Sequence, residues 1–241
     1  MNMLLNPFWF AAQGGGGGGG DGFQLVGSKT FEISVTAGTE VVTLPDGEEG
    51  RTIEEGDFVM VFRACDDGNL TVDSPIATSG YTNAYDAGGV SLVGAAFDYK
   101  FMGVTPDSLV EIGGSDVRKQ AGIIVVWRGV NSSTPLDVAV TTASGTSGMP
   151  NSPSITPVTS GCMIFAAGFL DDDDAAASVT VPAGYGGLVS GDTGLASTSS
   201  GATAMLANVE QEVAAAIDAD AFGGTGNDTW EAIAFALRPA A

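Results

Sequence analysis

The feature that most constrains the fold is a motif that the chain contains twice. Asp57–Cys65 mixes Val, Phe and Met with one Arg, follows Gly56 and ends in an acidic turn. Gly161–Asp174, GCMIFAAGFLDDDD, repeats the glycine, the apolar run and the acidic end. A short apolar run rich in β-branched and aromatic residues, bounded by turn residues, is typical of a strand buried on both faces. We therefore expect Asp57–Cys65 and Cys162–Leu170 to be equivalent strands of one sandwich.

The similarity continues downstream of both runs. Each half carries a proline and a tyrosine in a glycine-rich loop and closes on an apolar strand that contains a Trp and ends near an Arg. The matched segments are Pro75 and Tyr81 with Pro182 and Tyr185, and Ala121–Val130 with Trp230–Ala240.

This order of segments predicts the fold class. Short strands separated by Gly and Pro turns indicate an all-β sandwich or barrel. A twofold sequence repeat fits a jelly roll built from two Greek-key halves. We predict a jelly-roll-like antiparallel β-sandwich over residues 23–241, with half-repeats at about 56–130 and 161–241.

Three segments carry more detailed expectations. Phe31–Leu44 alternates and is interrupted by a glycine, which predicts a hairpin or a strand with a bulge. Asn131–Pro157 is rich in Ser, Thr, Pro and Gly and reads as a loop-dominated crossover between the halves. Met205–Asp218 has helix-forming composition, but its counterpart in the first half is a strand, so we expect a strand and keep a helix as the alternative.

Residues 1–22 form a separate N-terminal arm with a hydrophobic peptide and a polyglycine tether. Met1–Gln13 has no charge, and Gly14–Gly20 is a run of glycines. Glycine loses the most backbone freedom on ordering, so the run predicts a flexible tether with a span of about 15 Å. We expect the peptide to dock into a partner protein. A strap folded over its own domain, disorder, and a bundle of glycine runs from sister chains remain alternatives. The candidate anchor residues are Leu4, Leu5, Phe8, Trp9 and Phe10.

Charge excludes several classes of function. The net charge is −21, with 8 Lys and Arg against 29 Asp and Glu. Nucleic-acid binding needs a basic patch, which so few Lys and Arg residues do not supply. The excess of negative charge also disfavours binding to anionic membrane surfaces. No apolar run is long enough for a transmembrane helix, and the N-terminus lacks the features of a signal peptide. We expect two buried thiols at Cys65 and Cys162, although a disulfide stays possible.

The residues also argue against catalysis. The chain contains no histidine, which excludes His-based triads and His metal sites, and it has no nucleophile elbow or phosphate-binding loop. We therefore expect no enzyme activity and no cofactor. An acidic run, matched in the first half by Asp66 and Asp67, is a weak candidate for calcium, although a solvated loop tip is the simpler interpretation. That run is Asp171, Asp172, Asp173 and Asp174.

Aromatic residues offer the remaining candidates for ligand contact. Trp127 and Trp230 lie in apolar strands and are expected in the core. Tyr81, Tyr85 and Tyr185 lie in predicted loops at one expected end of the sandwich. Tyr81 and Tyr185 are therefore the candidate ligand-binding residues, for example for a sugar.

Between about Gly56 and Pro239 the chain carries, in order, the motifs GDFVMVFRACDD, GYTNA, FDYKFMG, IIVVWRGVNSSTPLDV, PSITPVTSGCMIFAAGF, PAGY and WEAIAFALRPA. This run of motifs resembles a group of jelly-roll proteins of tailed bacteriophages, tail-associated or other surface proteins of the virion. The resemblance implies a structural, non-enzymatic role and supplies no catalytic residues.

The expected function is therefore that of a virion structural protein on a tail or tail fibre, with a role in host attachment. Alternatives are a capsid decoration protein and a carbohydrate-binding host-receptor adhesin. A glycan hydrolase on the same scaffold is disfavoured. The expected partners are other virion proteins bound through the arm, further copies of the chain and a possible host glycan, without nucleic acid or membrane insertion. The expected location is the particle surface, after synthesis in the host cytoplasm.

Overall fold

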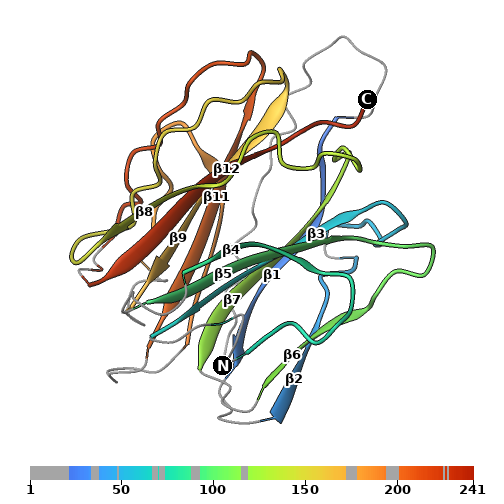
Figure 1. Ribbon diagram of the computed structural model, residues 1–241, viewed down its shortest axis with the longest axis horizontal. Helices are drawn as coiled ribbons and strands as arrows, with labels where there is room; N and C mark the ends of the chain where they lie inside the picture. Colours follow the sequence, from blue (N-terminus) through green and yellow to red (C-terminus); the bar gives the residue numbers. More distant parts are fainter. Residues whose placement is uncertain are drawn as a thin grey trace.

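The strands of the protein form two five-stranded sheets that pack face to face (Figure 1). The structure is a computed structural model that describes residues 22–33, 38–47, 49–66, 70, 74–87, 93–114, 119–171, 178–193, 201–224, 226 and 228–241. Neighbouring strands within each sheet are antiparallel. The predicted all-β antiparallel sandwich is therefore confirmed.

The first sheet is built from the first half of the chain, in the order β1-β7-β3-β5-β4. Its central strand β3 is the apolar run that the sequence singled out, and all of its side chains are buried. The strands are β1 (Gln24–Ile33), β3 (Phe58–Cys65), β4 (Thr82–Asp86), β5 (Gly94–Phe101) and β7 (Gln120–Arg128).

The second sheet is built from the second half, in the order β10-β11-β9-β12-β8. Its central strand β9 is the second copy of the apolar run and is likewise buried along its whole length. The strands are β8 (Thr141–Gly145), β9 (Cys162–Leu170), β10 (Gly186–Asp192), β11 (Thr203–Gln211) and β12 (Trp230–Leu237).

The two sheets have the same strand order. When the five sheet strands of each half are numbered in chain order, their order across the sheet is 1-5-2-4-3 in both halves. β3 and β9 therefore occupy equivalent central places, as the sequence repeat predicts. The order does not confirm the Greek-key halves, because a Greek key has the spatial order 4-1-2-3 whereas the last four strands stand as β12-β9-β11-β10.

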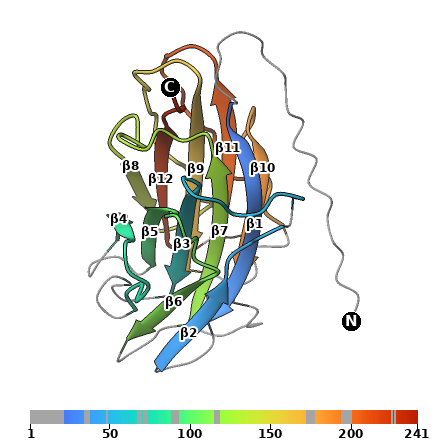
Figure 2. The same ribbon diagram turned by 90° about the vertical axis from the view of Figure 1, so that its right-hand side faces the viewer.

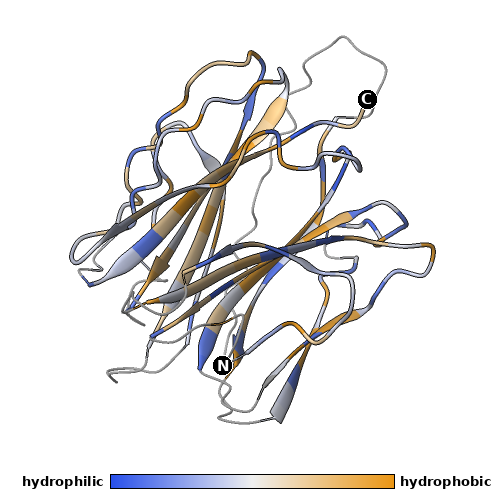
Figure 3. Ribbon diagram, in the orientation of Figure 1, coloured by the Kyte–Doolittle hydropathy of each residue, from blue (hydrophilic) through white to orange (hydrophobic). Residues whose placement is uncertain are grey.

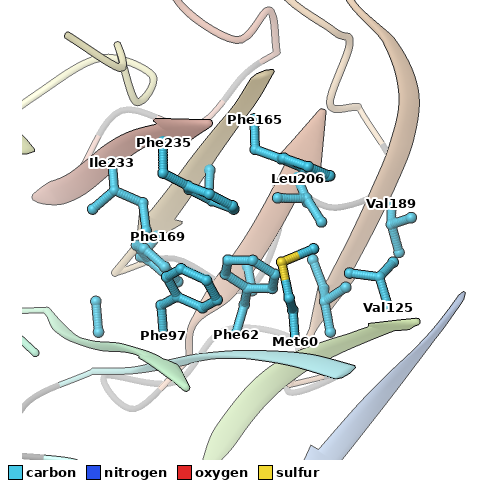
Figure 4. Close-up of a cluster of buried hydrophobic side chains, with 14 of the residues drawn as sticks. Met60, Phe62, Phe97, Val125, Phe165, Phe169, Val189, Leu206, Ile233 and Phe235 are labelled. Carbon is cyan, nitrogen blue, oxygen red and sulfur yellow. The ribbon is translucent and has the colours of Figure 1, made fainter. Parts of the chain in front are cut away.

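The core lies between the sheets and is dominated by phenylalanines. Figure 4 shows Phe62 and Phe97 of the first sheet facing Phe165 and Phe235 of the second. The Phe97 and Phe235 rings lie 4.6 Å apart and the Phe165 and Phe235 rings 4.9 Å apart, both stacked. Apolar residues follow the strands of both sheets, whereas polar residues gather in the loops (Figure 3). This shared core joins the two halves into one sandwich.

The outer faces of both sheets are covered as well, which explains why the central strands are apolar on both sides. A two-stranded ribbon, β2 (Gly38–Thr43) with β6 (Leu109–Gly114), packs Val42, Val110 and Ile112 against Val59 and its neighbours on the first sheet. The second sheet is covered by loop side chains. These are Met149, Ile155, Val179, Tyr185, Ile217, Ala219 and Phe222.

The structure corrects one local prediction, agrees with a second and confirms part of a third. Residues 31–44 form neither a hairpin nor one bulged strand, because β1 pairs with β7 while β2 pairs with β6. The expected crossover contains a strand, β8, at the rim of the second sheet. The segment with helical propensity begins as the strand β11, which ends at Gln211, because pairing with β9 and β10 overrides that propensity.

We predict that Phe235→Ala lowers the free energy of unfolding by about 3–5 kcal/mol, because it leaves a cavity where both sheets meet. The measurement is the denaturant midpoint at constant slope. Val104→Ala is the control, since Val104 is 81% exposed and should change stability by less than about 0.5 kcal/mol. A loss of unfolding free energy below about 1 kcal/mol for Phe235→Ala would contradict the central place of Phe235 in the core.

Candidate functional site

The two candidate ligand-binding tyrosines do not form one site. Tyr81 packs on the outer face of the first sheet, next to the apolar residues under the β2–β6 ribbon. Tyr185 packs on the outer face of the second sheet. The shared core separates these faces, so Tyr81 and Tyr185 do not contribute to one ligand site.

Neither tyrosine presents a fully exposed ring. Burial, with Asp218 nearby, raises the pKa of Tyr185 to about 12. Burial also raises the pKa of Tyr81, with further contributions from Asp107 and Asp98. Both phenols are therefore protonated at neutral pH. Their partial burial makes them part of the packing between loops and sheets.

The third tyrosine joins the two sheets. Tyr85 lies in β4, its ring stacks on Phe169 at 6.3 Å, and its hydroxyl donates to Glu231 Oε2 over 3.0 Å. Burial and the neighbouring Glu231 carboxylate raise the pKa of Tyr85. Tyr85 thus closes the side of the sandwich where β4 and β12 approach each other.

The main polar cluster lies around Arg63, in the middle of β3 and 0% exposed. Arg63 Nη2 donates to Asp98 Oδ2 over 2.9 Å, and Nη1 donates to the Ser74 carbonyl. Asp98 Oδ1 also accepts from Asn83 Nδ2 over 3.0 Å. A buried charge is tolerated only when it is paired and hydrogen-bonded. The cluster therefore holds residues 74–83 against the first sheet.

Lys100 extends this cluster to the surface. Its Nζ donates to Asp107 Oδ2 over 2.6 Å and to the Ser79 carbonyl over 2.9 Å, and it lies 5.6 Å from the Tyr81 ring centre. Both cations of the cluster are thus neutralised by a carboxylate. The described contacts of the cluster are those of a structural network.

A second kind of polar contact fixes the ends of the closing strands. Arg128, the last residue of β7, binds Asp57 through two hydrogen bonds, Nε to Oδ1 at 2.8 Å and Nη2 to Oδ2 at 2.9 Å. Asp57 directly precedes β3 and its Oδ2 also accepts from the Glu54 amide. The hydrogen bond to Asp57 raises the pKa of Arg128. The pair therefore joins the end of β7 to the start of β3, its neighbour in the first sheet.

The second half makes the equivalent contact with a different aspartate. Arg238, which follows β12, donates from Nε to Asp137 Oδ1 over 2.9 Å. Asp137 Oδ2 accepts from the amides of Val158 and Thr159, which lead into β9. Burial alone would raise the pKa of Asp137, but the hydrogen bonds from Thr159, Val158 and Arg238 outweigh it and lower the pKa to about 2.

The two cysteines lie in different sheets and are buried thiols, as expected. Cys162 Sγ lies 3.1 Å from the Thr159 carbonyl. Burial, with the Asp137 carboxylate nearby, raises the pKa of the Cys162 thiol to about 12. Because only the thiolate is an effective nucleophile, Cys162 is not activated for chemistry.

The remaining sequence candidates lie mostly outside the described residues. This holds for Leu4, Leu5, Phe8, Trp9 and Phe10 and for Asp172, Asp173 and Asp174. Asp171 directly follows β9, and its amide donates to the Thr229 carbonyl. In the described ranges, no three His, Cys, Asp or Glu side chains cluster as metal ligands. The calcium interpretation of the acidic run stays a prediction.

The two tryptophans of the strands differ in burial. Trp127 is buried in the main core, with its ring centre 6.0 Å from that of Phe165. Trp230 is partly buried at the start of β12, where its Nε1 donates to the Ser147 carbonyl. The described part of the chain has no helix long and apolar enough to cross a membrane.

Comparisons with known proteins add no relative. No family model, curated protein or solved structure matches the chain.

Sequence reasoning missed the Arg63 cluster, although one signal was present. Arg63 interrupts an otherwise apolar run that was expected to be buried on both faces, and a buried Arg requires an acidic partner. Asp98 interrupts β5 in the same way. Their pairing could have been proposed from these two exceptions, but the strand register that brings them together could not.

We predict that Asp98→Leu costs about 3–5 kcal/mol of unfolding free energy, because it leaves the Arg63 charge buried and unpaired. The double variant Arg63→Met/Asp98→Leu should recover most of this loss, since both charges are removed together. Urea unfolding of the two single variants and the double variant completes a double-mutant cycle. Additive losses would show that the two side chains are not coupled.

We also predict a pH dependence that arises from Asp137. Its pKa is about 2 in the folded protein, below the ordinary aspartate value of 3.8, so its contribution is present above pH 4 and is lost as the pH falls towards 2. The shift corresponds to about 2 kcal/mol. Asp137→Asn should be less stable than wild type by about this amount at neutral pH, with the difference vanishing near pH 2. The exposed Asp220→Asn is the charge-matched control, and an equal effect there would contradict the assignment.

Proposed function

We propose that this chain is a non-enzymatic structural protein of a tailed-bacteriophage virion, a surface protein of the tail or tail fibres that is anchored through its N-terminal arm. The observation that carries the proposal is the order of three parts along the chain. An uncharged apolar peptide, Met1–Gln13, comes first, followed by the tether Gly14–Gly20 and then by the sandwich, whose first strand begins at Gln24.

The free energies favour docking of the arm into another protein. Each large apolar side chain of the arm gains roughly 1.5–3 kcal/mol when it leaves water. Fixing the tether along its own domain would cost about 1 kcal/mol or more for each glycine, which offsets most of that gain. Docking into a partner leaves the tether free, so the gain is kept.

The attachment point of the tether supports this arrangement. Phe23 directly precedes β1, and its ring meets Trp127 edge-on at 6.4 Å. This contact fixes where the folded domain starts, at an edge of the first sheet. In this proposal the anchor peptide precedes that first contact of the sandwich along the chain.

The character of the polar contacts agrees with a structural role. Arg63 joins β3 to the neighbouring strand β5 and to the Ser74 carbonyl, Arg128 joins the end of β7 to the start of β3, and Arg238 joins the segment after β12 to the loop residue Asp137. We also propose that the sandwich is a jelly roll. This description is supported by the two sheets around one core and by the resemblance of the sequence motifs.

The proposal includes the location and partners of the chain. The chain would lie at the particle surface after synthesis in the host cytoplasm, in several copies, with other virion proteins bound to its arm. A capsid decoration protein would use the same arm and sandwich in the head. Labelling of purified particles with antibodies against the sandwich, followed by electron microscopy, distinguishes tail from head.

We predict that deletion of Met1–Gln13 leaves the melting temperature within about 2 °C of wild type and abolishes incorporation into particles. The physical reason is that the peptide contributes its apolar burial to the partner and none to its own domain. Incorporation is measured by co-purification with particles, against a control that shortens only the glycine run by two residues. A truncated chain that unfolds would identify the arm as a strap, and normal incorporation would remove its anchoring role.

The adhesin alternative has its own readout. A glycan array probed with the full chain would show specific binding that is lost in Tyr81→Ala or Tyr185→Ala. Because these side chains lie on opposite outer faces, loss in both variants would require two separate sugar sites. No binding on the array would leave attachment through the arm as the remaining interaction.

A further inference from the structure

The four edge strands of the two five-stranded sheets are not equally protected. The register shifts at Leu25/Gly27 in β1, at Asn83/Tyr85 in β4 and at Gly186/Val189 in β10. Each of these three strands also carries at least one charged residue. Bulges and charges are the usual means by which an edge strand is kept from pairing with another chain.

β8 lacks both kinds of protection. Its sequence is TTASG, and its five residues pair with β12 without a register shift. It forms the rim of the second sheet in the strand order, and Figures 1 and 2 both show it at the outside of that sheet. Within the described ranges, no backbone hydrogen bond joins β8 to a strand other than β12.

The direction of the free backbone groups follows from the neighbouring contacts. The Asp137 amide donates to the Ala236 carbonyl, so this carbonyl points towards the β8 side of β12. By strand alternation, Ala234 and Ala232 also use their backbone groups towards β8, where they face Thr141 and Ala143. The backbone groups of Thr142 and Ser144 therefore point outward, and both residues are exposed.

The charge distribution along the chain favours a second copy of the same chain as the partner of this edge. The chain has a net charge of −21, so contact between two copies is opposed by repulsion over most of the surface. The segment that contains β8 is the exception, because Val138–Leu170 holds no Asp, Glu, Lys or Arg. Glu231 of β12 pairs with Ser144, but its carboxylate accepts from the Tyr85 hydroxyl on the side of the first sheet. A second copy that approaches along this edge therefore meets no charged side chain of β8 itself.

We propose that β8 is the interface through which two copies of this chain associate, by antiparallel pairing of β8 with β8 of the second copy about a twofold axis at Ala143. In this register Thr142 of one copy faces Ser144 of the other, and each such pair exchanges two backbone hydrogen bonds. The two second sheets then form one continuous sheet across an isologous interface. The inference does not rest on the virion role or on the arm.

The first test measures the mass of the full-length chain by sedimentation equilibrium. Because the shared strand is short, association is expected only at micromolar or higher concentration, so the range should run from about 5 to about 500 µM. The mass should rise from one copy, 24.1 kDa, towards twice that value, and more readily at high salt because repulsion is screened. A mass that stays at one copy over this range overturns the proposal.

Paired variants assign the association to β8. Thr142→Lys/Ser144→Lys places lysines opposite each other across the axis and should abolish the dimer, with an unchanged melting temperature. Thr82→Lys/Ser133→Lys adds the same charge at exposed positions elsewhere and should leave the dimer intact. Association that persists in the β8 variant would come from another surface, such as the arm, and would overturn the proposal.

A cross-link tests the register itself. Ala143→Cys places two thiols opposite each other at about 4.5 Å between Cα atoms, within the range of a disulfide, and mild oxidation should yield a covalent dimer. Thr141→Cys is the matched control, because the two copies of that position would lie roughly 13 Å apart. The native Cys65 and Cys162 are 0% exposed. Equal cross-linking at both positions would contradict the register.

Discussion

The structure depends on the packing of two central strands that are buried on both faces. β3 and β9 contribute phenylalanines to the shared core, where Phe62 and Phe165 stack with Phe97 and Phe235. Their opposite faces are apolar too and must be covered, by the β2–β6 ribbon on one side and by long loops on the other. The low charged fraction of 15% is a consequence, since so many positions along the strands are removed from water.

Burial on both faces also determines where charges can lie. Three arginines stand in or next to the central strands, and each is paired with a buried aspartate. Because an unpaired charge in these places would cost several kcal/mol, the pairs fix the contacts between strand ends and loops. The charged groups of these pairs are engaged with each other in ion pairs, which agrees with the proposed structural role.

The repeat gives the two halves the same strand order but different edges. Three edge strands combine a register shift with charges, whereas β8 is regular and uncharged. The two equivalent halves therefore differ at one edge, the rim of the second sheet that β8 forms. The proposed assembly through β8 and the proposed attachment through the arm use different parts of the chain, so the two proposals are compatible.

The sequence by itself determined the two central strands and their equivalence, because burial on both faces requires the apolar runs at Asp57–Cys65 and Cys162–Leu170. It also predicted a strand over the helix-prone Met205–Asp218, through its counterpart in the repeat, and the structure confirms this as far as Gln211. Only the tertiary structure decided which strands pair and which side chains meet. The separation of Tyr81 from Tyr185 and the contact of Arg63 with Asp98 follow from strand order and register. These depend on contacts between residues far apart in the chain, for which local patterns carry no signal.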